Sequence, residues 1–332
     1  MQLMKRISFW RQLIQWGFLA WCLFLGWRFA LFVRHFETRG AEPLVARPPG
    51  VEGFLPIGAL VSLKNWLVNG VFDAVHPAAL VIFLTIVGLS LLTRKSFCSW
   101  LCPVGTISEA LHKLGQRLLG RSFRMWQWLD ILLRGVKYAL LAFFLKTILL
   151  DMPGAALQGF LRSPYWAVSD VKMLHFFFGL SVTALMVIAS LAVLSLFFPN
   201  FWCRYLCPYG ALLGLGGMLS PLKVCREAET CTGCRKCSRA CPAALPVHEK
   251  KAVRSAECTA CLTCVESCPQ RGTLEIKTRF LARPLPRFGF AALVLILFGV
   301  GVGAGMLTGN WHSALSYQDY QYLIPLTPRL GH

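Results

Sequence analysis

The stretch that decides the fold reads Cys231-Thr-Gly-Cys234-Arg-Lys-Cys237-Ser-Arg-Ala-Cys241-Pro242, and it recurs as Cys258-Thr-Ala-Cys261-Leu-Thr-Cys264-Val-Glu-Ser-Cys268-Pro269. Each run separates three cysteines by two residues and puts a fourth directly before a proline. Three thiolates at this spacing can surround one metal cluster, while the fourth reaches across to the cluster of the other run. The two runs therefore predict two cluster sites that exchange one ligand each.

This spacing is typical of two [4Fe–4S] clusters. We expect the first cluster on Cys231, Cys234, Cys237 and Cys268, and the second on Cys258, Cys261, Cys264 and Cys241. The alternatives are a pair of zinc sites or a disulfide scaffold. Zinc does not need a duplicated run that ends in proline, and a reducing compartment disfavours disulfides. Residues 223–280 are thus predicted to form a 2[4Fe–4S] ferredoxin-like α+β domain.

Two further cysteine pairs form an internal repeat, which we call the two elbows. The first elbow spans Phe97–Gly105 with Cys98 and Cys102, and the second spans Trp202–Gly210 with Cys203 and Cys207. Both share the frame aromatic-Cys-x-aromatic-Leu-Cys-Pro-x-Gly, and parallel repeats would bring the elbows close together. If an elbow is helical, the spacing of four puts both of its thiols on one face. The four thiols could form a dithiol relay or a third metal centre, or they could be small buried residues. Cys22 is interpreted as a packing residue and Cys225 as a lone thiol.

The composition around these motifs is that of a membrane protein. Of 332 residues, 56% are hydrophobic and 15% are charged, against about 25% charged in an average soluble domain. This excludes an ordinary cytosolic enzyme. Five stretches are apolar and long enough to cross about 30 Å of hydrocarbon as helices. They are Trp10–Val33, His76–Leu92, Leu129–Leu150, Met173–Phe198 and Phe288–Leu307. We interpret the first as an uncleaved anchor.

The net charge of +19 predicts the orientation of these spans. With Arg11 counted as part of the N-terminus, 23 Lys and Arg residues fall on the side of the N-terminus and the cysteine runs, and 7 fall on the other side. The positive-inside rule then places the N-terminus and the iron–sulfur domain in the cytoplasm and the C-terminus in the periplasm. The basic loops favour lipid or an acidic redox partner over nucleic acid, because cluster ligands are interleaved with the charge.

The remaining organisation follows from the spans. Phe54–Phe72 contains Lys64, Asn65 and Asn69, so we favour a re-entrant or interfacial helix over a sixth span. The glycine run Gly299–Gly305 lies inside an apolar span, which indicates close helix packing rather than a dinucleotide loop.

The predicted regions are an anchor with an outer loop (1–53), the re-entrant segment with span two and the first elbow (54–128), spans three and four with the second elbow (129–222), the ferredoxin domain (223–280), and the fifth span with a short outer tail (281–332).

Together these motifs resemble the membrane polyferredoxins. That family includes the quinol-dehydrogenase membrane subunit of periplasmic nitrate reduction, the membrane regulator of nitrous-oxide reduction and the assembly ferredoxin of the cbb3 oxidase. The resemblance covers residues 76–275. Three features depart from the family. The large flavin-binding domain expected for the nitrous-oxide type is not recognisable, and the immunoglobulin-like domain expected for the assembly type does not follow the cysteine runs. A fifth span follows them instead, which the nitrate-reduction type lacks. The resemblance implies a bacterial inner-membrane protein that exchanges electrons with the quinone pool, together with ferredoxin-like or cytochrome c-type subunits.

Some weaker candidates concern quinone and haem. Arg134 and Lys137 share a helix face near the inner start of span three, where they could contact a quinone, an anionic cluster or a lipid head group, or simply extend to the surface. His76 and His175 lie near the outer start of the two repeat spans and could bind a haem or accept quinol protons. Ordinary interfacial residues are favoured over both roles, and haem is not favoured.

The leading hypothesis is an electron-transfer component of a quinol-linked oxidoreductase complex that passes single electrons between quinone and a partner redox protein. The alternative is an assembly or metal-reducing factor for a respiratory metalloenzyme, in which the elbow cysteines would reduce or carry the metal. Because the clusters are expected inside, a quinol site on the outer face would leave about 30 Å of bilayer to cross. Quinone binding near the inner face, close to Arg134 and the elbows, avoids that gap.

Overall fold

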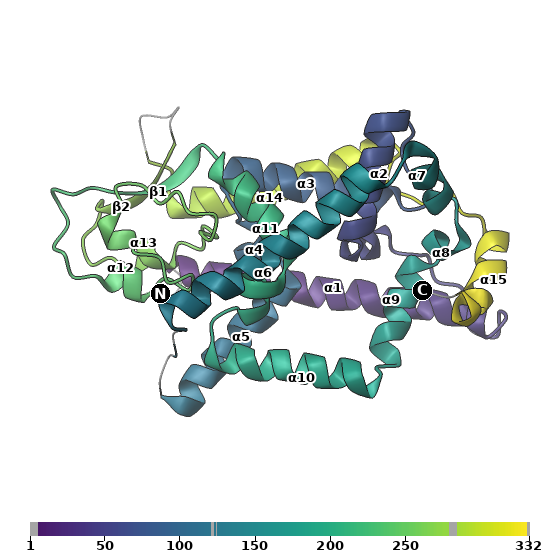
Figure 1. Cartoon of the computed structure of the whole chain (residues 1–332), viewed down its shortest axis with the longest axis horizontal. Helices are drawn as coiled ribbons and strands as arrows, with labels where there is room; N and C mark the ends of the chain where they lie inside the picture. The colour runs from purple at the N-terminus through teal and green to yellow at the C-terminus, as the bar shows by residue number, and fades with distance from the viewer. Residues whose placement is uncertain (1–5, 121–122, 124, 279–283, 331–332) are drawn as a thin grey trace. The chain divides into compact units, whose positions relative to one another are not determined.

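We analysed a computed structural model, which describes residues 6–120, 123, 125–278 and 284–330. The elements up to the first elbow are α1 (Ile7–Glu37), η2 (Pro49–Phe54), α2 (Pro56–Asn69), α3 (Pro77–Thr93), α4 (Phe97–Trp100) and α5 (Pro103–Leu119) (Figure 1). The elements up to the second elbow are α6 (Gln127–Leu145), η3 (Lys146–Asp151), α7 (Gly154–Leu161), α8 (Pro164–Ala167), α9 (Ser169–Phe178), α10 (Val182–Phe197), η4 (Trp202–Leu206) and α11 (Pro208–Met218). The rest are β1 (Leu222–Arg226), α12 (Lys236–Arg239), η5 (Val247–Glu249), α13 (Thr263–Glu266), β2 (Leu274–Thr278), α14 (Arg287–Leu307), α15 (Tyr317–Leu326) and η6 (Thr327–Arg329).

The chain divides into two compact units. Unit 1 consists of Met1–Leu19, Ile86–Leu141 and Val187–Gly299, and unit 2 of Ala20–Thr85, Ala142–Met186 and Val300–His332. Unit 1 contains both elbows and all eight cysteines of the two runs. The mostly helical architecture agrees with the predicted fold class.

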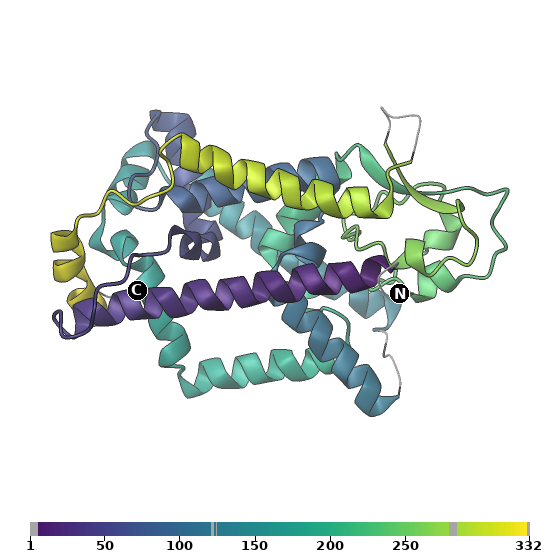
Figure 2. The same ribbon diagram turned by 180° about the vertical axis from the view of Figure 1, so that it is seen from behind.

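Two described helices, α1 and α14, are long and apolar enough to cross a membrane (Figure 2). They contain the first and fifth predicted spans. The predicted second span corresponds to α3, an apolar helix of 17 residues. Two further pairs of helices are bent, and if each pair is counted as one span, the described part of the chain has up to four spans. The protein is therefore membrane-associated, and the count of five spans stays a prediction.

The bends lie where the sequence interrupts helical hydrogen bonding. The helix Gln127–Asp151 is followed by Pro153 and meets α7 at 107°. The predicted span Met173–Phe198 is two helices, because α9 ends before Gly179 and α10 starts again at an angle of 79°. The Ser181 hydroxyl accepts the Ala184 N–H at 3.2 Å, so it caps the start of α10. The apolar run alone did not reveal this break, since the residues on both sides of it are mostly apolar.

In unit 2, α2 packs against α7 and α8 through an apolar cluster. This cluster consists of Val61, Ile148, Leu157, Leu161 and Trp166. At 14 residues, α2 is about 21 Å long, which is less than the hydrocarbon thickness. Its Lys64 ammonium donates to the Ile148 carbonyl at 3.0 Å, so the charge has a partner inside the protein. These features fit a re-entrant or interfacial helix, whose placement in the membrane remains a prediction.

The glycine run of α14 serves helix packing, as expected. In unit 2, a Cβ on Gly301 would lie 2.3 Å from the Thr85 hydroxyl oxygen of α3. A Cβ on Gly305, one turn later, would lie 2.5 Å from a Val81 methyl group of the same helix. The two glycines therefore let α14 and α3 approach closely, which is the small-xxx-small pattern of membrane helices.

Candidate functional site

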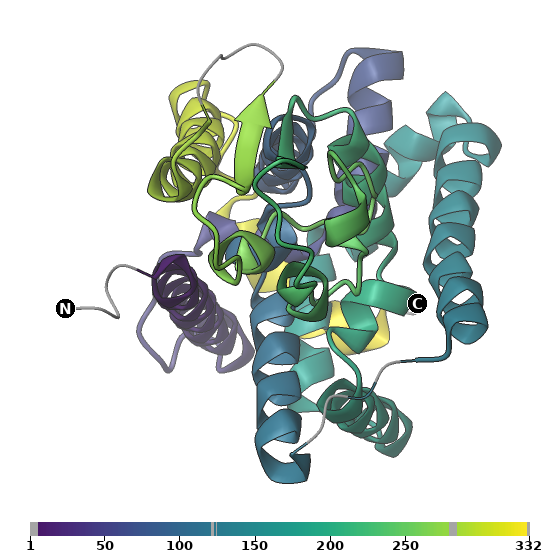
Figure 3. The same ribbon diagram turned by 90° about the vertical axis from the view of Figure 1, so that its left-hand side faces the viewer.

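The two cysteine runs are built on a small scaffold with internal symmetry. Strands β1 and β2 belong to this scaffold (Figure 3) and pair antiparallel. In their register, Val224 lies opposite Ile276. The short helices α12 and α13 each begin after a residue with positive φ, Arg235 at 59° and Leu262 at 60°. These two residues occupy the same place in the two runs, directly after the second cysteine. The duplicated sequence therefore folds as a duplicated turn, which presents the thiols of each run in the same way.

The first predicted ligand set shares one cavity. The side chains that line it include the four cysteines Cys231, Cys234, Cys237 and Cys268. A hydrogen bond from the Gly233 backbone N–H and then one from Arg226 hold the pKa of the Cys231 thiol below its ordinary value. The pKa of Cys234 is lowered too, first by the Lys236 backbone N–H. These donors favour thiolates, which are the form that binds iron.

The second ligand set shares a separate cavity that is more deeply buried. It is lined by Cys241, Cys258, Cys261 and Cys264. Burial raises the pKa of Cys241 to about 12, and it also raises the pKa values of Cys258 and Cys264. Thiols in such a place lose their protons when a metal binds rather than spontaneously. In each set, the fourth cysteine comes from the other run, which is the crossed pattern that the spacing predicts.

The loop of the second set is anchored to the first elbow. The Arg94 guanidinium, 1% exposed, donates to the carbonyls of Val253 at 2.6 Å and Ser255 at 2.7 Å. The Ser99 hydroxyl donates to the Thr259 carbonyl at 2.7 Å, and the Trp100 indole N–H donates to the Ala260 carbonyl at 3.1 Å. The elbow and the second cluster loop therefore form one continuous structure within unit 1.

The two elbows adopt the same geometry, although neither is one continuous helix. Cys98 and Cys203 each sit in a short helical turn, whereas Cys102 and Cys207 are extended residues that cap α5 and α11. The Cys102 N–H donates to the Phe97 carbonyl at 2.9 Å, and the Cys207 N–H donates to the Trp202 carbonyl at 3.0 Å. The Cys207 thiol accepts the Gly210 N–H at 3.2 Å. The second thiol of each elbow thus lies at a helix N-terminus.

The elbows come together, as the internal repeat predicts. After burial, the neighbouring thiols of Cys102, Cys207 and Cys98 are the next causes that raise the pKa of Cys203 well above its ordinary value. Cys98 and Cys203 also line one cavity with the Lys95 ammonium and with Cys261 of the second cluster set. All four elbow thiols therefore occupy one neighbourhood beside the second cluster site.

Arg134 and Lys137 share a helix but point to different partners. Lys137 is fully buried, and its ammonium lies 2.7 Å from both carboxylate oxygens of Glu257. Burial opposes ionisation of Glu257, but Lys137 and then Lys95 outweigh it and hold its pKa below the ordinary value. Arg134 instead lies 2.9 Å from Asp130. The spacing of Arg134 and Lys137 along the helix did not reveal that they have different partners, since the partners are set by the tertiary fold.

Arg134 borders a cavity of unit 1 that has a volume of about 540 Å³. The same cavity is lined by Phe123, Phe198 and His112, and by Cys241 of the second cluster set. Asp130, on its wall, accepts from the Arg204 guanidinium at 2.8 Å and from the Tyr205 hydroxyl at 2.6 Å. Volume and mixed lining fit a small-molecule site, for which 300–1,000 Å³ is usual.

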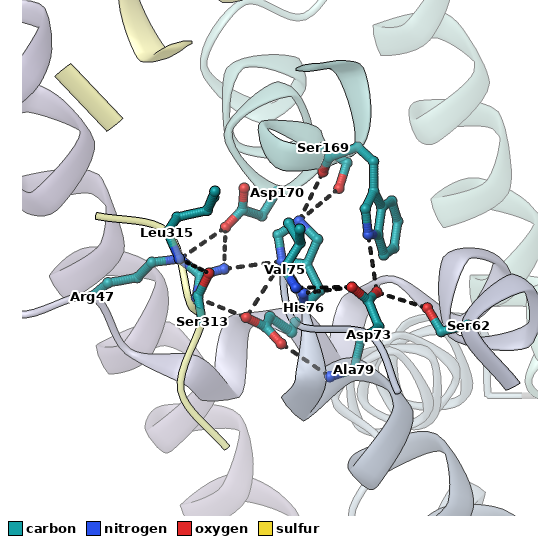
Figure 4. A network of polar contacts seen from close by, with 12 residues as sticks. Arg47, Ser62, Asp73, Val75, His76, Ala79, Ser169, Asp170, Ser313 and Leu315 are labelled. Atoms are coloured by element: carbon teal, nitrogen blue, oxygen red, sulfur yellow. Dashed lines mark hydrogen bonds and ion pairs between the residues drawn. The ribbon is translucent and has the colours of Figure 1, made fainter. Parts of the chain in front are cut away.

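Unit 2 contains a buried polar network around His76 (Figure 4). The Arg47 guanidinium lies 2.7 Å from Glu52 and 2.6 Å from Asp170, and these two carboxylates raise the pKa of Arg47 despite its burial. The His76 ring contacts Arg47 at 3.2 Å through Nδ1 and the Trp166 carbonyl at 2.8 Å through Nε2.

This arrangement gives His76 no free ring nitrogen for haem iron. His175 does not join the network, because its Nε2 lies 2.8 Å from Glu37 in a partly exposed position. Matched sequence positions suggested that the two histidines act together, whereas their contacts differ. Sequence reasoning also missed Arg47 and Glu52, whose importance comes only from burial.

Among the described residues, no group of three or more His, Cys, Asp or Glu side chains is arranged to hold a single metal ion. This applies to the elbows and to the two cysteine runs alike. A four-iron cluster is larger than an ion and needs its thiols further apart than the single-ion geometry does. The cavities between the thiols are therefore the relevant feature of both sites.

Comparison with known proteins supports this assignment of chemistry. A model described as a 4Fe-4S binding domain matches residues 75–122 and 179–224, which contain the two elbows, and a 4Fe-4S dicluster domain matches residues 223–269. The chain is 44% identical over 99% of its length to YccM of Escherichia coli (strain K12), a proposed electron transport protein, and covers 93% of that protein.

Two further relatives carry ferredoxin-type names. The ferredoxin-type protein NapH of Haemophilus influenzae is 26% identical over 74% of this chain and 80% of its own length. The methylamine utilization ferredoxin-type protein MauN of Methylorubrum extorquens is 31% identical over 57% of this chain and 61% of its own length. No solved structure matches the chain.

Proposed function

Because the chain belongs to the membrane-associated, ferredoxin-type polyferredoxin family, we propose that it passes single electrons between the quinone pool and a partner redox protein. The observation that carries this proposal is the grouping of the eight cysteines into two crossed sets of four, each around its own cavity. When bound, a [4Fe–4S] cluster in each set supplies one-electron chemistry at a potential tuned by its surroundings.

The residues of the chain prepare both sets for iron. Backbone N–H groups and Arg226 stabilise thiolates in the first set, which is the more exposed of the two. The second set is held in place by Arg94, Ser99 and Trp100, which reduces its freedom to rearrange when charge changes. We assign the exposed set to electron exchange with a partner protein of ferredoxin or cytochrome c type. The buried set would exchange electrons with the quinone.

The cavity of about 540 Å³ is the proposed quinone site. Its aromatic side chains, Phe123 and Phe198, suit a quinone ring, and Arg134 can donate to a carbonyl oxygen. Cys241 lies on its wall, so a quinone there would be next to the second cluster site. Oxidation of one quinol releases two electrons and two protons, and two one-electron centres can accept those electrons in turn. This location also removes the need to carry electrons across the bilayer.

The proposed setting is a bacterial cytoplasmic membrane. The excess of Lys and Arg around the elbows and the cysteine runs supports a cytoplasmic position for the N-terminus and both cluster sites. The C-terminus would then lie in the periplasm. A basic cytoplasmic face would also favour an acidic partner protein.

Reduction by quinol tests the proposed function. The anaerobically purified protein is mixed with a short-chain quinol, and the clusters are followed by visible absorption and electron paramagnetic resonance. Arg134→Gln removes a charged donor from the cavity and should slow the reduction about tenfold, as the loss of about 1.5 kcal/mol implies. Arg117→Gln, an exposed residue of α5 outside the cavity lining, is the matched control and should change the rate little.

Dithionite should reduce all three proteins equally, because it needs no cavity. Clusters that never respond to quinol or quinone would overturn the quinone role, and equal rates for Arg134→Gln and the control would overturn the position of the site. If metal ions were reduced instead, and this reaction required the elbow cysteines, the protein would be a metal-reducing factor.

A further inference from the structure

We propose that the exposed face of the first cysteine run is the docking surface for a small acidic electron-carrier protein. Its charges come from Arg235, Lys236 and Arg271, which define what we call the basic face. This inference rests on the proposed function and deepens it, because it places the partner protein on one surface and selects a ferredoxin-like carrier over a basic cytochrome c. It is carried by the packing of the two runs, by the charges that differ between them and by the position of those charges beside the first set.

The two cysteine runs fold alike, but the second run is packed against other parts of unit 1. The carbonyl groups of Thr259 and Ala260 accept hydrogen bonds from the first elbow at 2.7 Å and 3.1 Å. Leu262, directly after the second cysteine of this run, is 1% exposed. The Glu266 carboxylate accepts the Ser8 backbone N–H at 3.0 Å, which attaches α13 to α1. This face of the second run is therefore covered by the protein itself.

The matching face of the first run is open to solvent. Thr232, Gly233 and Arg235 occupy the corresponding places, and all three are exposed. Cys234, which lies among them, is exposed as well, whereas the other described cysteines are buried or half-buried. Because the duplicated turn gives both runs the same form, the face that binds protein in the second run has an exposed counterpart in the first. That counterpart is available to a partner protein and contains a cluster ligand.

The charges of the basic face are not needed for the fold. Each of its three residues has an uncharged match at the second set. The matched pairs are Arg235 with Leu262, Lys236 with Thr263, and Arg271 with Ala244. The shared turn therefore accepts uncharged residues in all three places, so folding alone does not explain why the first set is surrounded by positive charge.

The three basic residues lie beside the cavity of the first set. Arg235 lines this cavity, and Lys236 follows it directly in the sequence. Gln270 lines the cavity as well, and Arg271 follows it. All three basic residues are exposed, and the exposed Glu229 offsets one of their charges. The loops around the first set thus present a positive surface at the place where its electron would leave or enter.

A surface of this kind selects its partner by charge. Complementary charges raise the rate of association by about 10–10³-fold and orient the partner before contact. They attract a small acidic carrier to the exposed cysteine and repel a basic cytochrome c. The reduced carrier then gives one electron to the oxidised cluster of the first set. The carrier is oxidised, the cluster is reduced, and no bond or proton is transferred.

Binding to a plant-type [2Fe–2S] ferredoxin, which is an acidic protein, tests the basic face. The full chain is placed in nanodiscs of zwitterionic phospholipid, and its affinity for oxidised ferredoxin is measured at an ionic strength of about 0.1 M, where charges interact over about 10 Å. The variant Arg235→Leu/Lys236→Thr/Arg271→Ala gives the first set the residues of the second. It should bind ferredoxin about tenfold more weakly, and the difference should shrink at about 1 M salt.

The matched control removes three positive charges elsewhere. Arg6→Gln/Arg117→Gln/Arg254→Gln changes exposed residues that do not line the cavity of the first set, so its affinity should stay within about twofold of the wild type. Iron content checks that both variants are loaded, because each retains every cysteine. Stopped-flow mixing with reduced ferredoxin then gives the rate of electron transfer, which should fall about tenfold in the first variant and little in the control.

Three results would overturn the proposal. The first is equal affinity of the two variants for ferredoxin, and the second is tighter binding of a basic cytochrome c than of ferredoxin by the wild type. The third is loss of ferredoxin binding in nanodiscs of anionic phospholipid, which would show that the basic face lies against the membrane. Failure of the proposed function is visible separately, because the response of the clusters to quinol is measured without ferredoxin and the affinity for ferredoxin without quinol.

Discussion

At the scale of single residues, the glycine that ends the repeated frame of the first elbow has a steric reason. A Cβ on Gly105 would lie 2.4 Å from the Cys98 carbonyl oxygen and 3.6 Å from the Cys102 Cβ. Both contacts are with the cysteines of the same elbow, and the first is with rigid backbone. The glycine of the aromatic-Cys-x-aromatic-Leu-Cys-Pro-x-Gly frame in the first elbow thus meets a packing requirement.

Gly105→Ala should therefore lower the free energy of unfolding by about 1–3 kcal/mol, the usual range for overpacking. Denaturant unfolding in detergent micelles measures this. Gly88→Ala is the control, because nothing lies within 4 Å of a Cβ at Gly88 in α3. Alanine favours a helix by about 0.8–1.0 kcal/mol over glycine, so the control should be neutral or slightly stabilising. Equal effects of the two substitutions would contradict the steric explanation.

Residue-scale prediction from the sequence indicated which cysteines group together and missed the charged residues that surround them. Cysteine spacing is a local property, so it indicated both the crossed grouping of the eight thiols and the pairing of the elbows. Lys95 and Glu257 carry no local signature, since a charged residue is noticeable only once its burial is known. Arg134 and Lys137 were noticed through their spacing, but their separate partners, Asp130 and Glu257, come from other parts of the fold.

At the scale of elements, one buried ion pair joins helix α6 to the loop of the second cluster set. The side chain of Lys137 is 0% exposed and that of Glu257 is 8% exposed, and Tyr138 donates to the same carboxylate at 3.1 Å. The pair is therefore isolated from water. Removing one member leaves the other charge buried alone, which is more costly than removing both.

Lys137→Met should therefore destabilise the protein by about 3–5 kcal/mol. The double variant Lys137→Met/Glu257→Leu should recover most of that loss, because it leaves no unpaired charge in this pair. Lys146→Met is the control: its pair with Asp151 is 66% and 49% exposed, so it should cost less than about 1 kcal/mol. Thermal or denaturant unfolding of the iron-loaded protein in detergent gives the three values. A single variant no worse than the control would show that the pair contributes little.

At the scale of elements, prediction succeeded where the residues of a helix themselves determine its length and polarity. The long apolar helices α1 and α14 followed directly from hydropathy. The break between α9 and α10 did not, because Gly179 and Ser181 interrupt backbone hydrogen bonding without lowering the hydrophobicity of the run. The same limit applies to α2, whose partners α7 and α8 follow much later in the chain.

At the scale of the whole molecule, the sequence predicted the family and the chemistry better than the arrangement. Duplicated motifs are recognisable because their spacing is conserved within the chain itself, once in the cysteine runs and once in the elbows. Cavities are not recognisable in this way, since each is lined by side chains from several segments. The proposed quinone site, with Arg134 and Cys241 on its wall, therefore required the fold.

The anchors of the second cluster loop also have a consequence for the order in which the protein is made. Arg94, Ser99 and Trp100 leave the ribosome well before residues 253–260, whose carbonyl groups they bind. The loop can settle only onto a first elbow that has already been synthesised and placed beside its helix. We therefore expect any iron that this loop binds to be delivered after the first elbow has been synthesised and folded.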